Sequence, residues 1–216
     1  MKTIIDISWP ISPAMTSYKN NKPVTLTANK TMATDGVADS SITMNLHTGT
    51  HIDAPAHFIY GGATVESLDL QQCNGECRVL DLTADVFPGL ARGPAITPDD
   101  LKSHAPQYGE RLLLKTRNSD RGPEEAFDFD FVYLRSDAAQ YLIDCGVQLV
   151  GVDALGIERA QKDHATHQIL LGGGVIIIEG LRLGDVVAGD YQLNCAPLLI
   201  PQAEASPARV WLQGNN

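Results

Sequence analysis

Three histidines and one aspartate lie within eleven residues of each other in the segment HTGTHIDAPAHF. They are His47, His51, Asp53 and His57. Imidazole nitrogens and carboxylate oxygens are common protein ligands of divalent transition metals. All four residue numbers are odd, and in an extended chain every second side chain points to the same side. The segment therefore predicts a metal site with a catalytic group beside it.

The motif could in principle be helical, since His47 and His51 have the spacing of the H-E-x-x-H metalloproteases. On a helix, however, Asp53 would lie on nearly the opposite side, and Pro55 would interrupt the hydrogen bonding. The extended interpretation is therefore favoured, and Pro55 is expected to turn the chain and carry His57 around the rim of the site.

The residues just before the motif alternate between apolar and polar, which is typical of a half-buried strand. Ile42, Met44 and Leu46 are the apolar members. We expect one strand over residues 40–53, with these three side chains in the core and the odd-numbered residues facing the site. Gly49 has no side chain between the two histidines, so it is expected to leave open space for a metal and a substrate.

The plainer alternative is that these histidines are structural. A single histidine is more often hydrogen-bonded in the fold than bound to a metal. Four ionisable groups on one face of a half-buried strand are different, because unpaired buried charge costs several kcal/mol. A bound cation removes that cost, which favours the metal site.

A second cluster of candidate ligands follows about 110 residues later. Glu179 ends an apolar, β-branched run, and His164 and His167 lie three residues apart on a predicted helical turn. Glu179 could simply reach solvent, and either histidine could face the centre. Together with the first segment, a histidine and a carboxylate from here would complete a two-metal site with bridging carboxylates.

Composition limits the class of protein. The chain has 216 residues, 44% of them apolar and 19% charged, which suits a single folded domain over residues 1–216. Its net charge of −10 argues against a general nucleic-acid or anionic-membrane binder. The N-terminal apolar run is too short for a secretory signal, and no segment approaches the roughly 18 apolar residues of a membrane span. We expect a cytoplasmic protein that acts on a small molecule.

The four cysteines, Cys73, Cys77, Cys145 and Cys195, form no C-x-x-C motif. Cys73 and Cys77 could share a helix face and bind zinc or act in redox chemistry, but ordinary reduced thiols are the favoured interpretation.

Strands and a few helices alternate along the chain, which predicts an α/β fold with a mixed sheet. Strands are expected at residues 3–7, 24–34, 40–53, 78–82, 111–115, 147–152 and 175–178, and helices from residue 97, with Thr97 as cap, and over 136–144, with Ser136 as cap. The polar loop 116–130 is either a mobile lid or plain surface. No phosphate-binding glycine motif is present, and Gly172–Gly174 is expected to be a turn.

The motif resembles that of the cyclase family, whose best-known members are bacterial kynurenine formamidases and which includes isatin hydrolases. Its pattern H-x-G-T-H-x-D-x-P-x-H is matched in full by residues 47–57, and the similarity continues at 113–116, 150–153, 167–171 and 178–181. The resemblance implies that His47, His51 and Asp53 bind one metal and that Asp53 bridges to a second. His167 would be the downstream metal ligand and Glu179 the other bridge between the two metals. His57 would transfer protons, and His164 would lie in a supporting or surface position.

The same resemblance implies a swivelling three-layer β/β/α fold that assembles as a homodimer or homotetramer. One segment departs from the formamidase pattern, in which an aromatic residue that contacts the substrate precedes Pro-Gly-Asp. Here the residues are Tyr18-Lys19-Asn20-Asn21, so Tyr18 retains an aromatic ring for substrate binding but the following turn differs.

The expected activity is hydrolysis, assisted by two Zn²⁺ or Mn²⁺ ions, of an N-formyl aromatic amine such as N-formylkynurenine. One alternative is the opening of a cyclic amide or ester, as in isatin hydrolases. Another is a metal-binding protein without catalytic activity, although a closed structural site would not keep a spare acid–base group such as His57.

Overall fold

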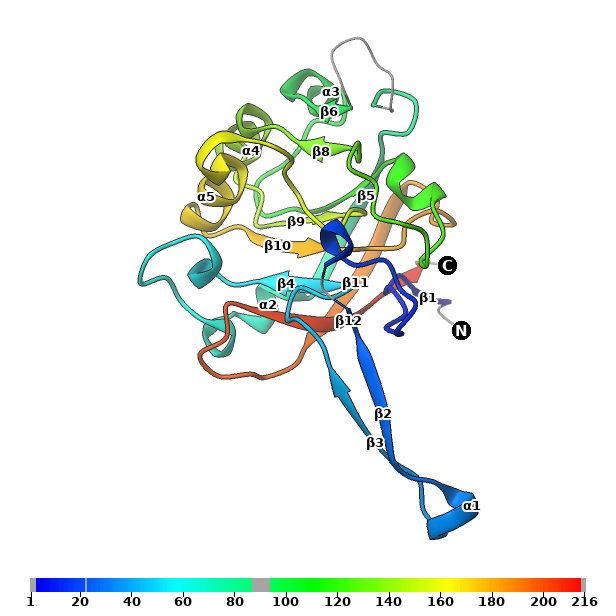
Figure 1. Ribbon diagram of the computed structural model, residues 1–216. Coiled ribbons are helices and arrows are strands. Elements are labelled where there is room, and N and C mark those ends of the chain that lie inside the picture. The colour runs from blue at the N-terminus through cyan, green and yellow to red at the C-terminus, as the bar shows by residue number, and fades with distance from the viewer. Residues whose placement is uncertain (1–2, 22, 87–93, 215–216) are drawn as a thin grey trace.

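The structure is a computed structural model that describes residues 3–21, 23–86 and 94–214 (Figure 1). Eight strands of the described chain form one mixed sheet. Their order is β1 (Ile4–Asp6), β12 (Ala205–Gly214), β11 (Gly189–Pro197), β5 (Gly75–Asp81), β7 (Arg111–Lys115), β9 (Leu149–Val152), β10 (Ile176–Glu179) and β4 (His51–Asp53). Because β4 pairs with β12 as well as with β10, all of these strands except β1 make a closed ring.

The strands β5, β7, β9 and β10 pair in parallel, and the other pairs in the ring are antiparallel. Parallel strands are usually covered on both faces, and the sequence of β7 shows this in Leu112, Leu113 and Leu114, which are all fully buried. Leu113 points into the ring, whereas Leu112 and Leu114 pack toward the helices.

The helices that cover this face are α3 (Pro98–Lys102), α4 (Ser136–Asp144) and α5 (Ala165–Gly172) (Figure 1). Leu142 of α4 and Leu170 of α5 belong to the same buried cluster as Leu112 and Leu114. A second cluster fills the ring between its two sides. The layer of helices and the two opposite sides of the closed sheet form three layers. The predicted α/β fold with a mixed sheet is therefore confirmed.

The helix starts match the prediction in part. Thr97 and Asp100 form a reciprocal capping box at α3, with Pro98 in the first turn. At α4, Arg135 holds the cap position without a side-chain cap, and Ser136 is already the first helical residue. The remaining elements are short: α2 (Leu70–Cys73), β6 (Ala95–Ile96), β8 (Tyr133–Leu134), and 3₁₀ turns at Tyr18–Asn20, Pro55–His57, Val65–Ser67, Arg117–Asp120 and Lys162–His164.

A two-stranded arm projects from the body (Figure 1). It consists of β2 (Thr25–Lys30) and β3 (Asp39–Thr43), which pair as predicted, with α1 (Met32–Asp35) at the tip. The prediction of one strand over residues 40–53 is wrong, because β3 ends at Thr43 and regular strand structure resumes only at His51.

The expected core position of Ile42 is also wrong. This side chain is 50% exposed, since it lies on the arm, and only Met44 and Leu46 are partly buried against the body. The alternation of apolar residues is real, but the chain leaves the arm and turns before it joins the main sheet. Periodicity within a segment does not report whether that segment lies in the body of the protein.

Candidate metal centre

Strand register places the first ligands side by side. In the antiparallel pair of β4 and β10, His51 lies opposite Glu179, and Asp53 lies opposite Ile177. Ile52 points into the ring, so its two neighbours point to the helix-covered face, as does Glu179, which alternates with Ile178. The His51 Nε2 atom is 3.3 Å from Glu179 Oε2. The register alone therefore brings an imidazole and two carboxylates together.

Helix α5 supplies the next side chain. His167 shares its buried face with Leu170 and Leu171 and faces the sheet. Its Nε2 atom is 3.2 Å from Glu179 Oε1 and 3.7 Å from Asp53 Oδ2. The structure thus brings the two predicted ligand segments to one centre.

His47 reaches the same centre from a turn and not from a strand. Its Nδ1 atom is 3.0 Å from Asp53 Oδ1, and its Nε2 atom is 3.6 Å from Glu204 Oε1. The argument from alternating side chains therefore holds for His51 and Asp53 but not for His47. The convergence of all three was predicted, and the local geometry expected for His47 was wrong.

Gly49 does not open space for a ligand, contrary to expectation. Its φ is +61°, and an added Cβ would lie 3.2 Å from Met15 and 3.4 Å from Trp9. On its other side, a Cβ on Gly180 would lie 2.3 Å from the Gly49 carbonyl oxygen. Both positions therefore require glycine, because two backbone segments cross closely behind the ligands. The Thr50 hydroxyl links these segments by donating a hydrogen bond to the Gly180 carbonyl oxygen at 2.6 Å.

The buried polar atoms at this centre fit a divalent cation. Neither oxygen of Asp53 accepts a well-formed hydrogen bond from the described residues, and His51 Nε2 also has no hydrogen-bond partner there. Orphaned polar atoms in the interior cost about 1–3 kcal/mol each, or more when charged. Ligand atoms of His51, Asp53 and Glu179 lie within 4.8 Å of one another, as do those of His47, Asp53 and His57. Asp53 belongs to both groups, which is the arrangement of a bridging ligand.

Burial and neighbouring charge act against each other on the pKa values of the ligands. Burial by itself lowers the pKa of His167, but Glu158 and Glu179 outweigh it and raise the pKa to about 10. The pKa of His51 is also raised, because Glu179 and Asp53 overcome its burial. Burial raises the pKa of Glu179, yet the two histidines beside it hold it well below its usual range. The Glu179 carboxylate is therefore ionised, as a metal ligand must be.

His57 stands beside this cluster on the 3₁₀ turn that follows Asp53. Its ring centroid is 4.0 Å from that of His47 and 5.8 Å from that of His167. Burial lowers its pKa to about 4; Asp53 opposes the shift and His47 adds to it. A half-buried imidazole that is neutral at pH 7 can accept a proton.

Glu158 contacts this centre, although no sequence pattern marked it. Its carboxylate is buried, and it contacts both His164, at 2.6 Å, and His167, at 3.4 Å. His164 itself is exposed and faces Glu158, which agrees with the supporting position expected for it. Glu158 is a lone acidic residue in an irregular segment, so neither periodicity nor spacing marked it.

A cavity of about 300 Å³ opens over the cluster. His57 and His167 line its floor, and Tyr18, Phe58 and Leu155 give it apolar walls. Several residues on its rims have left-handed backbone conformations that cost energy in residues other than glycine. They are Lys19, Asn20, Ala160, Asp163 and His164. Such strain is often retained at functional sites.

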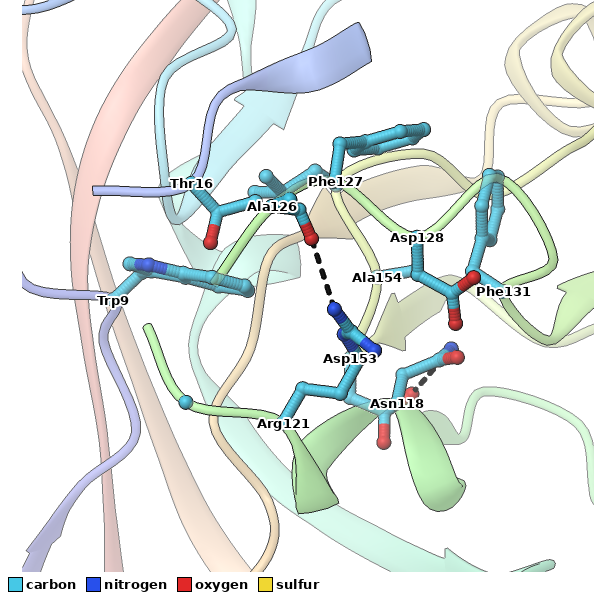
Figure 2. A pocket seen from close by; sticks show the side chains of 12 residues that line it. Trp9, Thr16, Asn118, Arg121, Ala126, Phe127, Asp128, Phe131, Asp153 and Ala154 are labelled. Carbon is cyan, nitrogen blue, oxygen red and sulfur yellow. Dashed lines mark hydrogen bonds between the residues drawn. The ribbon is translucent and has the colours of Figure 1, made fainter. Parts of the chain in front are cut away.

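The loop 116–130 packs against the N-terminal segment beside a smaller cavity of about 40 Å³ (Figure 2). The fully buried carboxylate of Asp153 accepts hydrogen bonds from the Thr116 amide and the Ser119 hydroxyl, and Trp9 Nε1 donates to the Pro123 carbonyl. These contacts fix the start and the middle of the segment in this conformation. Its opening as a lid stays a prediction.

The cysteines lie apart from the ligands. Cys73 ends α2 and Cys77 lies on β5, so they do not share a helix face. Burial raises the pKa of Cys73 to about 11 and of Cys77 to about 12. All four cysteines are free thiols, and no cysteine belongs to a candidate metal cluster of the described residues.

Comparison with known proteins gives the family. Residues 5–159 match the family described as "Putative cyclase", and the chain belongs to this family. It is 34% identical over 207 residues to a kynurenine formamidase of Bacillus cereus, covering 95% of this chain and 94% of that protein. A kynurenine formamidase of Salinibacter ruber is 33% identical over 213 residues, covering 97% of this chain and 97% of that protein.

Solved structures agree. A "potential metal-dependent hydrolase with cyclase activity" superposes with a TM-score of 0.87 at 41% identity, with both chains fully covered. Isatin hydrolase A of Ralstonia solanacearum has a TM-score of 0.83 at 20% identity, covering 99% of this chain and 92% of that one, and so shares the fold. Among the described residues, no helix is both long and apolar enough to cross a membrane.

Metal binding is expected to release protons. In the metal-free protein the raised pKa of His167 keeps it protonated below about pH 10, and a cation must displace that proton to bind Nε2. The apparent affinity for Zn²⁺ or Mn²⁺ should therefore rise with pH, by about tenfold per unit for each proton displaced. Calorimetric titrations at pH 7.5 in buffers of different ionisation enthalpy would measure the release. Binding that is independent of both pH and buffer would contradict this assignment.

Proposed function

We propose that this protein is a metal-dependent amide hydrolase that removes the formyl group from an aromatic amine such as N-formylkynurenine, giving formate and the free amine. The observation that carries the proposal is the position of His57. It lies against a buried cluster of metal-ligand type, is neutral at pH 7, and faces a cavity large enough for a small aromatic molecule.

The relatives support the same activity. Kynurenine formamidases match nearly the whole chain, and they are themselves covered over at least 94% of their length. The similar solved structures at 41% and 43% identity are titled as metal-dependent hydrolases. The substrate itself is our inference.

Two divalent cations are proposed, Zn²⁺ or Mn²⁺, because the ligands are nitrogen and oxygen without thiolate. His47, His51 and Asp53 would hold one, and Asp53, His167 and Glu179 the other. When bound, such cations lower the pKa of water and polarise a carbonyl group. The ionised carboxylates also offset the positive charge that the cations bring into the buried site.

The side chains around the cavity would transfer the proton and exclude water. His57 Nε2 or Nδ1 accepts a proton as water attacks the formyl carbonyl, and the resulting imidazolium returns it to the departing nitrogen, so that the amine leaves neutral. Tyr18, Phe58 and Leu155 exclude water around the aromatic ring. Tyr18 is held edge-on against Phe127 at 5.0 Å, which fixes its ring beside the cavity.

Lys19 favours a substrate with an anionic tail. Its side chain lines the cavity, and its Nζ atom lies 5.1 Å from the centroid of the Tyr18 ring. Among the described residues no carboxylate forms an ion pair with it. The amino-acid carboxylate of N-formylkynurenine suits this position, whereas isatin has no such group, so the linear formamide is preferred over the cyclic-amide alternative.

The non-catalytic alternative fits the cavity less well. A structural metal site is closed by its ligands. Here the cluster opens onto a cavity. His57 is half-buried beside the cluster, and the two proposed sets of ligands leave it out although it lies close to His47 and Asp53.

Replacing His57 tests the catalytic role. We expect His57→Asn in the metal-loaded enzyme to lower kcat by about 10²–10⁴-fold on N-formylkynurenine, while the metal content stays at the wild-type level. His104→Asn, which changes a histidine outside the cavity, is the control and should retain full activity. Wild-type turnover by His57→Asn would refute the assigned proton transfer.

Replacing Lys19 tests the substrate. N-formylkynurenine and 2-formamidoacetophenone carry the same formanilide, but only the first has a carboxylate tail. Lys19→Met should reduce kcat/KM about tenfold on the first, the effect of losing one charge-assisted hydrogen bond, and should not change it on the second. Lys30→Met, on the arm, is the matched control. Equal losses on both substrates, or faster opening of isatin by the wild type, would overturn this choice of substrate.

We also propose that the protein forms a homodimer or homotetramer and is cytoplasmic. The arm supports assembly, because Leu26 and Ile42 lie opposite each other across β2 and β3. The Leu26 side chain is 59% exposed and that of Ile42 is 50% exposed. An exposed apolar pair on a projecting hairpin suits contact with a second copy of the chain. The free thiols suit a reducing compartment.

Light scattering during size-exclusion chromatography tests the assembly. The wild type is expected at the mass of two or four chains, and the double variant Leu26→Lys with Ile42→Lys should shift toward the monomer. Val187→Lys, at another exposed apolar position, is the control and should not change the mass. A monomeric wild type would rule out the proposed homo-oligomer.

A further inference from the structure

The carboxylate of Glu158 contacts two histidine side chains and two backbone amides. It is only 6% exposed and lies in the segment between β9 and α5. One oxygen, Oε1, lies 2.6 Å from His164 Nδ1 and 3.4 Å from His167 Nδ1. The contact with His167 is a charge contact and not a well-formed hydrogen bond. The other oxygen, Oε2, accepts hydrogen bonds from the backbone amides of Thr166, at 3.0 Å, and His167, at 3.3 Å.

The contact with His167 favours one of its ring nitrogens as the metal ligand. When a cation displaces one of the two protons of this imidazolium, the carboxylate beside Nδ1 favours keeping the other proton on that atom, so that Nε2 supplies the lone pair. Nε2 is the nitrogen that faces Glu179 and Asp53. In His51, the Gly49 carbonyl oxygen lies 2.9 Å from Nδ1 and likewise favours a proton on that atom, so that Nε2 faces the cluster.

The contacts with the backbone determine where α5 begins. His164 holds the cap position with φ of +52° and makes no side-chain cap. The amides of Thr166 and His167, in the first turn, are instead satisfied by Glu158, whose negative charge also suits the positive end of the helix. One side chain therefore fixes both the position of His167 along the sheet and the orientation of its ring.

We infer that Glu158 is a positioning residue of the metal centre, which orients His167 toward the cation while holding the start of α5. The inference rests on the proposed metal site but not on the identity of the substrate. Its rival is that Glu158 serves only as a helix cap, with no influence on the affinity for metal.

Two substitutions separate these roles. Glu158→Gln keeps a carbonyl oxygen that accepts the amides of α5 but removes the charge that orients His167. Glu158→Ala removes both contacts. Glu204→Gln is the matched control, because Glu204 also faces a predicted histidine ligand, His47, but is 45% exposed and therefore more strongly screened by solvent.

The measurements are the dissociation constant for Zn²⁺, obtained by competition with a chelator, and the Tm in the presence of EDTA. We expect Glu158→Gln to weaken Zn²⁺ binding about 10–100-fold and to leave the Tm of the metal-free protein nearly unchanged. Glu204→Gln should weaken Zn²⁺ binding less. Glu158→Ala should weaken binding at least as much and also lower that Tm.

Two outcomes would overturn the inference. In the first, Glu158→Gln binds Zn²⁺ as tightly as the wild type. In the second, the loss of Zn²⁺ affinity in Glu158→Gln and Glu158→Ala is proportional to the fall in the Tm of the metal-free protein. Glu158 would then serve only as a helix cap. A wild type that binds Zn²⁺ but hydrolyses no formamide would refute the proposed function alone, because the affinities would still test Glu158. A wild type that binds neither Zn²⁺ nor Mn²⁺ would refute both.

Discussion

The antiparallel pairing of β4 with both β10 and β12 is the constraint on which the centre depends. Three residues, His51–Asp53, bridge the last gap in the ring of strands. Because Ile52 is buried inside, its neighbours must lie on the helix-covered face, and the register then sets His51 against Glu179. Displacement by a single residue would turn both ligands into the apolar interior.

The same constraint explains how much the sequence predicted. The shared face of His51 and Asp53 follows from strand geometry, and the apolar run before Glu179 is the β10 strand of the structure. The apolar runs of β9 and β10 predicted strands correctly because their residues are buried on both faces of the sheet. Local pattern was sufficient wherever the element that carries the residue is regular.

Irregular segments account for the errors. His47 lies in a turn and Ile42 on an arm, although both fitted the alternation of a single strand. Gly49 looked like free space because the sequence does not show that Gly180 and Trp9 pack against it. Glu158 was missed for the same reason, since its importance arises from contacts with α5 that no spacing encodes. These are tertiary effects between segments distant in the chain.

The position of β4 in the chain has a consequence for biosynthesis. Its partners lie more than 120 and more than 150 residues further on, in β10 and β12. During translation, His51 and Asp53 are therefore made long before the strands with which they pair. Long-range pairing of this kind folds slowly. The ligands of the centre can therefore come together only after β10, which carries Glu179, has been made.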